Sequence, residues 1–121
     1  MGVYTIRSFH KKSLTLKALL HCCYGFSKIS VELFEYLLVN GPADLKKLST
    51  VFQRDESTIY RHLQPLIEEG LVRICSQKME IGRPRNVYCA ITKSELVKKL
   101  KRLTEDWYKR VMKFIENLEF K

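Results

Sequence analysis

The stretch DLKKLSTVFQRDESTIYRHLQPLIEEGLVRICSQKMEIGRPRNVYCAI, residues 44–91, decides the fold of this chain. It reads as a short helix, a turn, a second helix that Glu69 and Gly70 close, and two strands around a Gly-Arg-Pro-Arg segment. This order of elements is typical of the winged helix-turn-helix. We therefore predict a mainly α fold with a small β-hairpin wing.

The second helix of this stretch has two different faces when its residues are placed about 100° apart. The apolar face carries Ile59, Leu63, Leu66 and Ile67, and the opposite face carries Ser57, Thr58, Arg61 and Gln64. The major groove of duplex DNA admits one α-helix, and Arg, Gln, Ser and Thr can match the hydrogen-bonding groups of its base edges. We predict a recognition helix that contacts DNA through Ser57, Thr58, Tyr60, Arg61 and Gln64. An ordinary solvated face, which most surface helices have, is the alternative.

Two acidic residues and a proline complicate this helix. Asp55 is placed to cap it, and Asp55 and Glu56 complement the helix dipole, but both bring negative charge toward the phosphates. Pro65 removes the backbone hydrogen bond to the Arg61 carbonyl, so the helix either bends there or ends early at Gln64.

Two runs rich in β-branched and aromatic residues, 71–75 and 87–91, predict the strands of a hairpin. Gly82 and Pro84 lie between them and predict a long loop. Cations on such a loop suit a narrow minor groove or the phosphates beside it. We predict that the DNA-binding wing includes Lys78, Arg83 and Arg85. A merely structural turn is the alternative.

Additional helices are predicted before this stretch. Ser13 is placed to cap a helix over residues 14–23, which Gly25 ends. Ser30 is placed to cap a second helix over residues 31–40, where apolar residues recur at helical spacing.

A long C-terminal helix is predicted from Thr92, which forms a T-x-x-E capping box with Glu95, to about Leu118. Over this length it spans roughly 40 Å, which is more than a small core can cover. Its apolar seam consists of Leu96, Leu100, Leu103, Trp107, Val111, Phe114 and Leu118. We predict that this seam joins two copies of the chain in a homodimer. A helix folded back on the chain's own N-terminal helices is the alternative.

Length and charge limit the class to which this protein can belong. The chain has 121 residues, which fit a single winged-helix DNA-binding domain, and 22 Lys and Arg against 13 Asp and Glu give a net charge of +9. Such a charge favours a polyanionic partner. We predict double-stranded DNA and not a membrane, because no apolar run approaches the roughly 20 residues of a spanning helix.

We divide the domain into three parts. Residues 1–29 form an N-terminal basic segment and helix, 30–91 the winged helix-turn-helix core, and 92–121 the C-terminal dimerisation helix. Residues 1–31 contain no acidic residue. This start is either a basic arm over the phosphate backbone or a solvated surface.

The cysteines lack the C-x-x-C spacing of a structural zinc site. We expect Cys22, Cys23, Cys75 and Cys89 to be buried thiols in a reducing cytoplasm, with no metal and no cofactor. A disulfide between Cys75 and Cys89, or a soft-metal or oxidation site at His21-Cys22-Cys23, is the alternative. We expect no enzyme, because there is no Ser/His/Asp set, phosphate-cradling glycine loop or paired catalytic carboxylate.

The runs GPADLKKL (41–48), DESTIYRHL (55–63), EGLV (69–72) and GRPRNVY (82–88) resemble small winged-helix transcriptional regulators of archaea. The resemblance is greatest to the TrmB-like and crenarchaeal Lrs-type groups, with the MarR and ArsR regulators as broader relatives. It implies a dimer joined through terminal helices, a recognition helix at 55–69, and a wing tip at Arg83 and Arg85.

The departures from these families bear on regulation. The sequence lacks the sugar-binding domain of full-length TrmB proteins and the Cys and His clusters of metal-sensing ArsR relatives, so no small-molecule effector is identifiable. We therefore predict a cytoplasmic, homodimeric regulator that binds promoter DNA sequence-specifically. The alternatives are a weakly specific chromatin-like protein that coats DNA and a winged-helix module that binds another protein.

Overall fold

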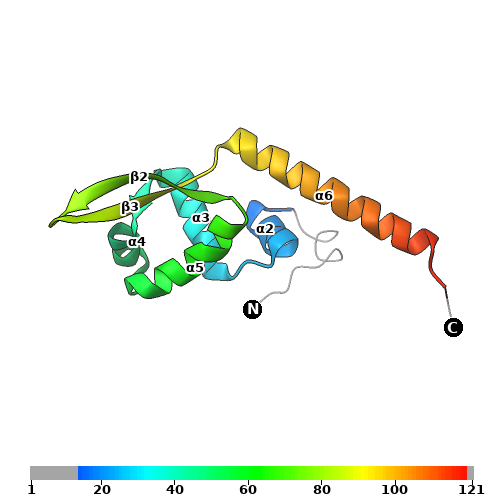
Figure 1. Ribbon diagram of the computed structural model, residues 1–121. Helices are drawn as coiled ribbons and strands as arrows, with labels where there is room; N and C mark the ends of the chain where they lie inside the picture. The colour runs from blue at the N-terminus through cyan, green and yellow to red at the C-terminus, as the bar shows by residue number, and fades with distance from the viewer. Residues whose placement is uncertain (1–13, 120–121) are drawn as a thin grey trace. The chain divides into compact units, whose positions relative to one another are not determined.

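The computed structural model describes residues 14–119 and confirms the predicted fold class (Figure 1). Its elements are α2 (Leu16–Tyr24), α3 (Lys28–Asn40), β1 (Ala43–Asp44), α4 (Leu45–Phe52), α5 (Glu56–Glu68), β2 (Val72–Glu80), β3 (Arg83–Ala90) and α6 (Lys93–Glu116). The chain divides into a first unit that ends at Ile91 and a second that begins at Thr92. The first unit is a helix-turn-helix with a β-hairpin wing.

The first two described helices begin at other residues than predicted. Thr15 caps α2 by accepting a hydrogen bond from the Ala18 amide, and Ser13 lies outside the described residues. Ser27 caps α3 by accepting a hydrogen bond from the amide of Ser30. The prediction that Ser30 caps α3 is therefore wrong, because a second suitable serine precedes it by one turn.

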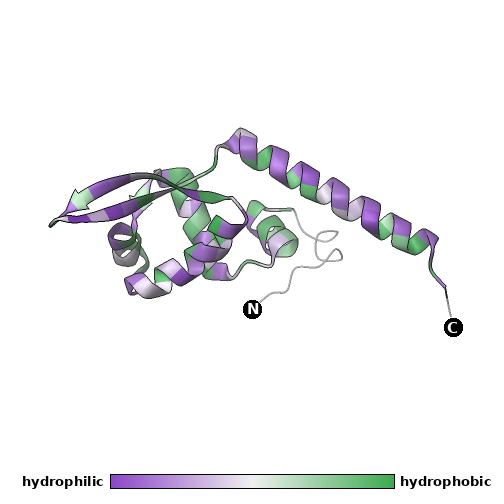
Figure 2. Cartoon of the chain, in the orientation of Figure 1, coloured by the Kyte–Doolittle hydropathy of each residue, from purple (hydrophilic) through white to green (hydrophobic). Residues whose placement is uncertain are grey.

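The core of the first unit lies among α3, α4 and α5. Leu33 and Phe34 of α3, Leu48 of α4, and Ile59 and Leu63 of α5 have no exposed surface. Burial of each such side chain contributes about 1.5–3 kcal/mol relative to exposure. The predicted inner face of α5 is confirmed at Ile59, Leu63 and Leu66, which are fully buried, whereas Ile67 is half-buried. Figure 2 shows both hydrophobic and hydrophilic residues along these helices.

A three-stranded antiparallel sheet with the order β1-β3-β2 flanks this core. Strand β1 was not predicted, because two residues are too short to show an alternating pattern. Its Ala43 pairs with Tyr88 and its Asp44 with Val87. This pairing connects the base of the hairpin to the start of α4.

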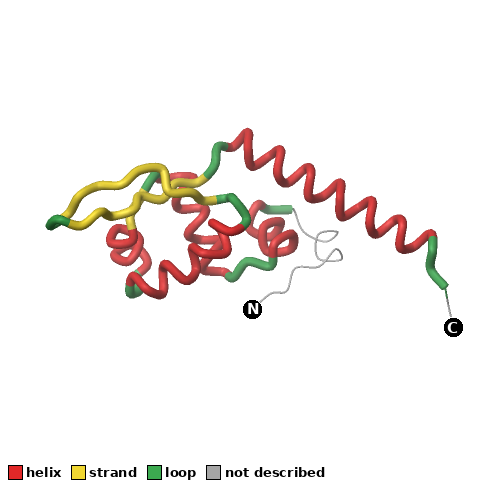
Figure 3. The backbone as a smooth tube through the Cα atoms, in the orientation of Figure 1, coloured by secondary structure: helices red, strands yellow, loops and turns green. Residues whose placement is uncertain are grey.

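The hairpin is longer than predicted, and its loop is short (Figure 3). Ile81 and Gly82 alone join the strands, and both have positive φ, 50° and 72°. A two-residue turn of this kind matches the twist of the strands it joins. The predicted long loop around Gly82 and Pro84 is therefore wrong. Pro84 is tolerated because it lies beyond the part of β3 that pairs with β1.

The second unit is the helix α6 with its flanking residues. Both halves of the predicted capping box between Thr92 and Glu95 are present, so the predicted helix start is confirmed. The 24 residues of α6 extend over about 36 Å. Among the described residues, no helix combines the length and apolar character that crossing a membrane requires.

Candidate nucleic-acid interface

The outward face of α5 holds the predicted recognition residues. Ser57 and Arg61 are exposed, the Tyr60 side chain is 45% exposed, and Thr58 and Gln64 are half-buried. Arg61 forms no ion pair within residues 14–119. Its guanidinium therefore remains available for a partner from outside the chain.

Helix α5 continues through Pro65 to Glu68, so the predicted alternative of an early end at Gln64 is wrong. The Pro65 carbonyl still accepts a hydrogen bond of 3.1 Å from the Glu69 amide. Leu66, directly after the proline, is fully buried and holds this last turn against the core. Packing thus compensates for the hydrogen bond that a proline cannot donate.

His62 anchors α5 to α3. The Ser30 hydroxyl donates to the His62 carbonyl over 2.7 Å, and the Ser27 hydroxyl lies 3.3 Å from the His62 ring nitrogen Nδ1. Burial lowers the pKa of His62, and the positive charges of Arg61 and Arg54 lower it further. The ring is therefore neutral near pH 7 and contributes no cation to the outward face.

The start of α5 is locally ordered by its own polar side chains. Asp55 occupies the N-cap position, and its carboxylate accepts a 2.7 Å hydrogen bond from the Ser57 hydroxyl. Hydrogen bonds from Thr58 and Ser57 hold the pKa of Asp55 below its ordinary value. The hydroxyls that were predicted to contact DNA thus organise the first turn of α5.

An ionic contact fastens the wing to α5. The two terminal nitrogens of Arg85 lie 3.1 and 3.3 Å from the two carboxylate oxygens of Glu56, which is a bidentate arrangement. The Nε of Arg85 lies 3.1 Å from Glu80, which also pairs with Lys46 at 3.2 Å. Arg85 therefore connects the wing to α5, and the negative charge of Glu56 is compensated within the protein.

A second ionic contact fastens the wing to α4. Lys78 Nζ lies 2.7 Å from Asp44, a carboxylate that is only 4% exposed and that also caps α4 through the Lys47 amide. Burial raises the pKa of Asp44, but the hydrogen bonds from Lys78 and the Lys47 amide outweigh it and hold the pKa below its ordinary value. Asp44 is thus charged at neutral pH and paired.

These contacts distinguish the three cations of the predicted wing. Lys78 and Arg85 are engaged with carboxylates of the same chain. Arg83 is exposed and forms no ion pair with any of the described residues. Sequence reasoning did not separate them, because Asp44 and Glu56, which pair with the other two, come from distant parts of the chain.

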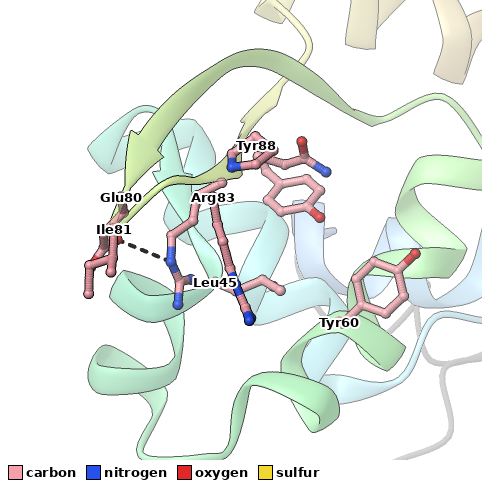
Figure 4. A pocket seen from close by; sticks show the side chains of 9 residues that line it. Leu45, Tyr60, Glu80, Ile81, Arg83 and Tyr88 are labelled. Carbon is pink, nitrogen blue, oxygen red and sulfur yellow. Dashed lines mark ion pairs between the residues drawn. The ribbon is translucent and has the colours of Figure 1, made fainter.

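A cleft of about 710 Å³ lies between α5 and the wing (Figure 4). It is lined by Leu45, Tyr60, Glu80, Ile81, Arg83, Pro84, Arg85, Asn86 and Tyr88. Figure 4 shows Tyr60 projecting from α5 on one side and the wing residues Glu80, Ile81 and Arg83 on the other. Sequence reasoning missed the contribution of Asn86 and Tyr88, which carry no charge and read as ordinary strand residues.

The predicted dimer seam runs from Leu96 in α6 to Leu118, just beyond the end of the helix at Glu116, and its exposure differs from residue to residue. Leu96 is buried, whereas the side chains of Trp107 and Phe114 are 53% and 66% exposed. Leu100, Leu103 and Val111 are half-buried, and Leu118 is 46% exposed. Figure 2 shows hydrophobic residues spaced along α6 between hydrophilic ones. The seam remains a prediction for a dimer interface.

All four cysteines are free thiols, but none is buried as predicted. Cys22 and Cys75 are exposed, and Cys75 is the extra residue of a β-bulge between Ile74 and Ser76. Burial and the neighbouring Cys75 thiol raise the pKa of Cys89 to about 11, which keeps it protonated. No group of three or more His, Cys, Asp or Glu residues that could hold a metal occurs in the described part of the chain.

Comparisons with known proteins agree with this arrangement. Residues 20–94 match the family described as "Sugar-specific transcriptional regulator TrmB". An uncharacterized protein of Methanocaldococcus jannaschii is 32% identical over 106 residues, which cover 88% of this chain and 80% of that protein. A second uncharacterized protein of the same archaeon is 26% identical over 104 residues, which cover 86% of each chain.

Two solved structures from archaea are similar in fold. A possible transcriptional regulator from Methanosarcina mazei matches with a TM-score of 0.77 and 19% identity, over 90% of this chain and 92% of that chain. A protein of Sulfolobus tokodaii matches with a TM-score of 0.62 and 18% identity, over 78% of this chain and 93% of that chain.

Proposed function

This chain belongs to the TrmB family of transcriptional regulators, and we propose that it acts by binding promoter DNA sequence-specifically as a homodimer. One observation carries the proposal. An exposed polar face of α5, with Arg61 at its centre, lies beside a wing whose Arg83 is likewise unpaired within the described residues. A recognition helix with an adjacent cationic wing suits one major groove and the backbone or minor groove next to it.

Each part of the interface has a distinct role in this proposal. Arg61 reads a guanine through two hydrogen bonds, and Gln64 reads an adenine. Ser57, Thr58 and Tyr60 position the helix through the phosphates or neighbouring bases. The cleft between α5 and the wing receives the sugar-phosphate backbone, with Tyr60 and Asn86 as donors and Arg83 as the cation.

In this proposal the α6 seam joins two chains, so that the dimer presents two such interfaces to DNA. In helix-turn-helix dimers, the two recognition helices enter successive major grooves about 34 Å apart. Exposed Trp107 and Phe114 are too large and apolar to favour water on a lone helix. A regulator that occupies promoters acts where the chromosome is, so the proposal places this chain in the cytoplasm.

The direct test is a fluorescence-anisotropy titration with random-sequence duplex and with DNA from upstream of the protein's own gene, each at two salt concentrations. Tight, saturable binding to the upstream fragment above a salt-sensitive background supports a specific regulator. Equal binding to both fragments favours a chromatin-like protein or an operator elsewhere in the genome. No binding at low salt refutes DNA binding and favours a protein partner.

The Arg61→Ala variant tests the base-reading role. It should cost about 1–3 kcal/mol at the preferred site and little on random duplex. Lys93→Ala is the matched control, because Lys93 is an exposed cation at the start of α6, outside the helix-turn-helix, the wing and the basic N-terminal segment. Equal losses on preferred and random DNA would assign Arg61 to a phosphate instead.

A further inference from the structure

The tip of the wing is apolar and exposed. Ile81, the first of the two turn residues, is 97% exposed, and Met79 just before it is 71% exposed. Met79 pairs directly with Pro84 on the opposite strand, and Pro84 is exposed as well. The far end of a hairpin that is otherwise polar therefore carries a compact group of hydrophobic side chains.

The backbone at the tip makes isoleucine an unfavourable choice. Ile81 has a φ of 50°, in the left-handed region that β-branched residues rarely adopt. Gly82 follows with a φ of 72°, so the turn has the geometry that Asn-Gly satisfies best. Neither turn geometry nor solubility explains an isoleucine here. A strained residue of this kind indicates a functional constraint.

One unpaired positive charge lies beside this apolar tip. Arg83 is adjacent to it and has no partner among the described residues, while Lys46, Lys78 and Arg85 hold the hairpin behind it through carboxylates. The chain as a whole carries +9. This charge complements an anionic partner, and the apolar tip needs a surface into which it can be buried. The minor groove of duplex DNA provides both where a base step opens, because its rims are phosphates and the faces of its bases are apolar.

We propose that Ile81, supported by Met79 and Pro84, is a wedge that enters the minor groove and partly unstacks one base step. Proteins that bend DNA from the minor groove insert Phe, Leu, Ile, Met or Pro in this way. The proposal rests on DNA binding by α5 and goes beyond it. It adds preference for a deformable step, such as a pyrimidine followed by a purine, at a position that α5 does not touch.

The Ile81→Asn variant separates the wedge from the rest of the interface. Asparagine accepts the left-handed conformation, so the variant should melt roughly 4 °C higher than the wild type. It should nevertheless bind a duplex enriched from a random pool by the wild-type protein about tenfold more weakly. Val39→Asn is the matched control, because Val39 of α3 is an exposed apolar residue outside the wing, at 82% exposure. This control should leave DNA affinity unchanged.

Unstacking is measured with 2-aminopurine placed at one position after another in the enriched duplex. Wild-type protein and an Ile81→Leu variant should raise the fluorescence at one flanking step, and Ile81→Asn should not. A wild-type protein that fails to bind duplex refutes the proposed function itself. Wild-type binding with equal affinity for Ile81→Asn, or with no 2-aminopurine response at any position, overturns the wedge alone.

Discussion

Replacing Asp44 should show how the wing is held on the helix-turn-helix. Its buried carboxylate does two things at once, because one oxygen accepts from the Lys47 amide at 2.8 Å and the other pairs with Lys78 at 2.7 Å. Asp44→Ala removes both contacts. Asp44→Asn keeps a good helix cap and removes only the charge.

The expected magnitudes follow from these contacts. Loss of the cap costs about 1 kcal/mol. The ion pair contributes about 1 kcal/mol and no more, because the Lys78 side chain is 57% exposed and water screens its charge. Asp44→Ala should therefore lose about 2 kcal/mol of unfolding free energy, and Asp44→Asn about 1 kcal/mol.

The pH dependence provides an independent check on the charge. The folded-state pKa of Asp44 is below its ordinary value, so its stabilisation is present above the unfolded-state pKa of about 3.9. It is lost as the pH falls through the lower, folded-state pKa. Urea unfolding of the wild type and Asp44→Asn should show a constant difference from pH 5 to pH 8 that shrinks below about pH 4. Equal stability of Asp44→Asn and Asp44→Ala, or a difference that persists in acid, would refute the reasoning.

Two further predictions concern the wing and the dimer. Arg83→Gln should reduce the salt dependence of DNA binding by about one counterion. Arg85→Gln should change the salt dependence less, because Glu56 and Glu80 already compensate the charge of Arg85. Equal effects of the two variants would contradict this internal pairing. Trp107 is the single tryptophan and is 53% exposed in one chain, so its emission should shift to shorter wavelength as the protein concentration rises through the dimer dissociation constant. Trp107→Ser together with Phe114→Ser should give a monomer by light scattering, and a dimer that persists would place the interface elsewhere.

The helices of the core were predictable because their burial is one-sided. Ile59 and Leu63 recur at helical spacing, and Asp55 is a polar residue placed before this apolar periodic run. The start of α3 was not predictable from these signals. Ser27 and Ser30 are both good caps one turn apart, and the choice depends on the contact of Ser30 with the His62 carbonyl, which is a tertiary feature.

The wing was harder to predict, because it has no buried face beyond its base. From Arg73 to Met79 every residue of β2 is exposed, so the alternation that marks a half-buried strand is absent. Pro84 and Gly82 then argued for a loop. The roles of Lys78 and Arg85 depend on carboxylates that lie 34 and 29 residues earlier in the chain, at Asp44 and Glu56, and no local pattern records such pairs.

The ion pairs of the wing give its apolar tip mechanical support. A two-stranded hairpin that water surrounds on both faces is marginally stable by itself. The contacts of Lys78 with Asp44 and of Arg85 with Glu56 fix it to the starts of α4 and α5, the two helices of the helix-turn-helix. A tip that pushes between bases needs this support, because a loose hairpin would yield before the bases unstack. Because Lys78 and Arg85 are paired with carboxylates of the protein, the wing attracts DNA less strongly by charge. The same pairs make the wing stiff enough for Ile81 to separate the bases.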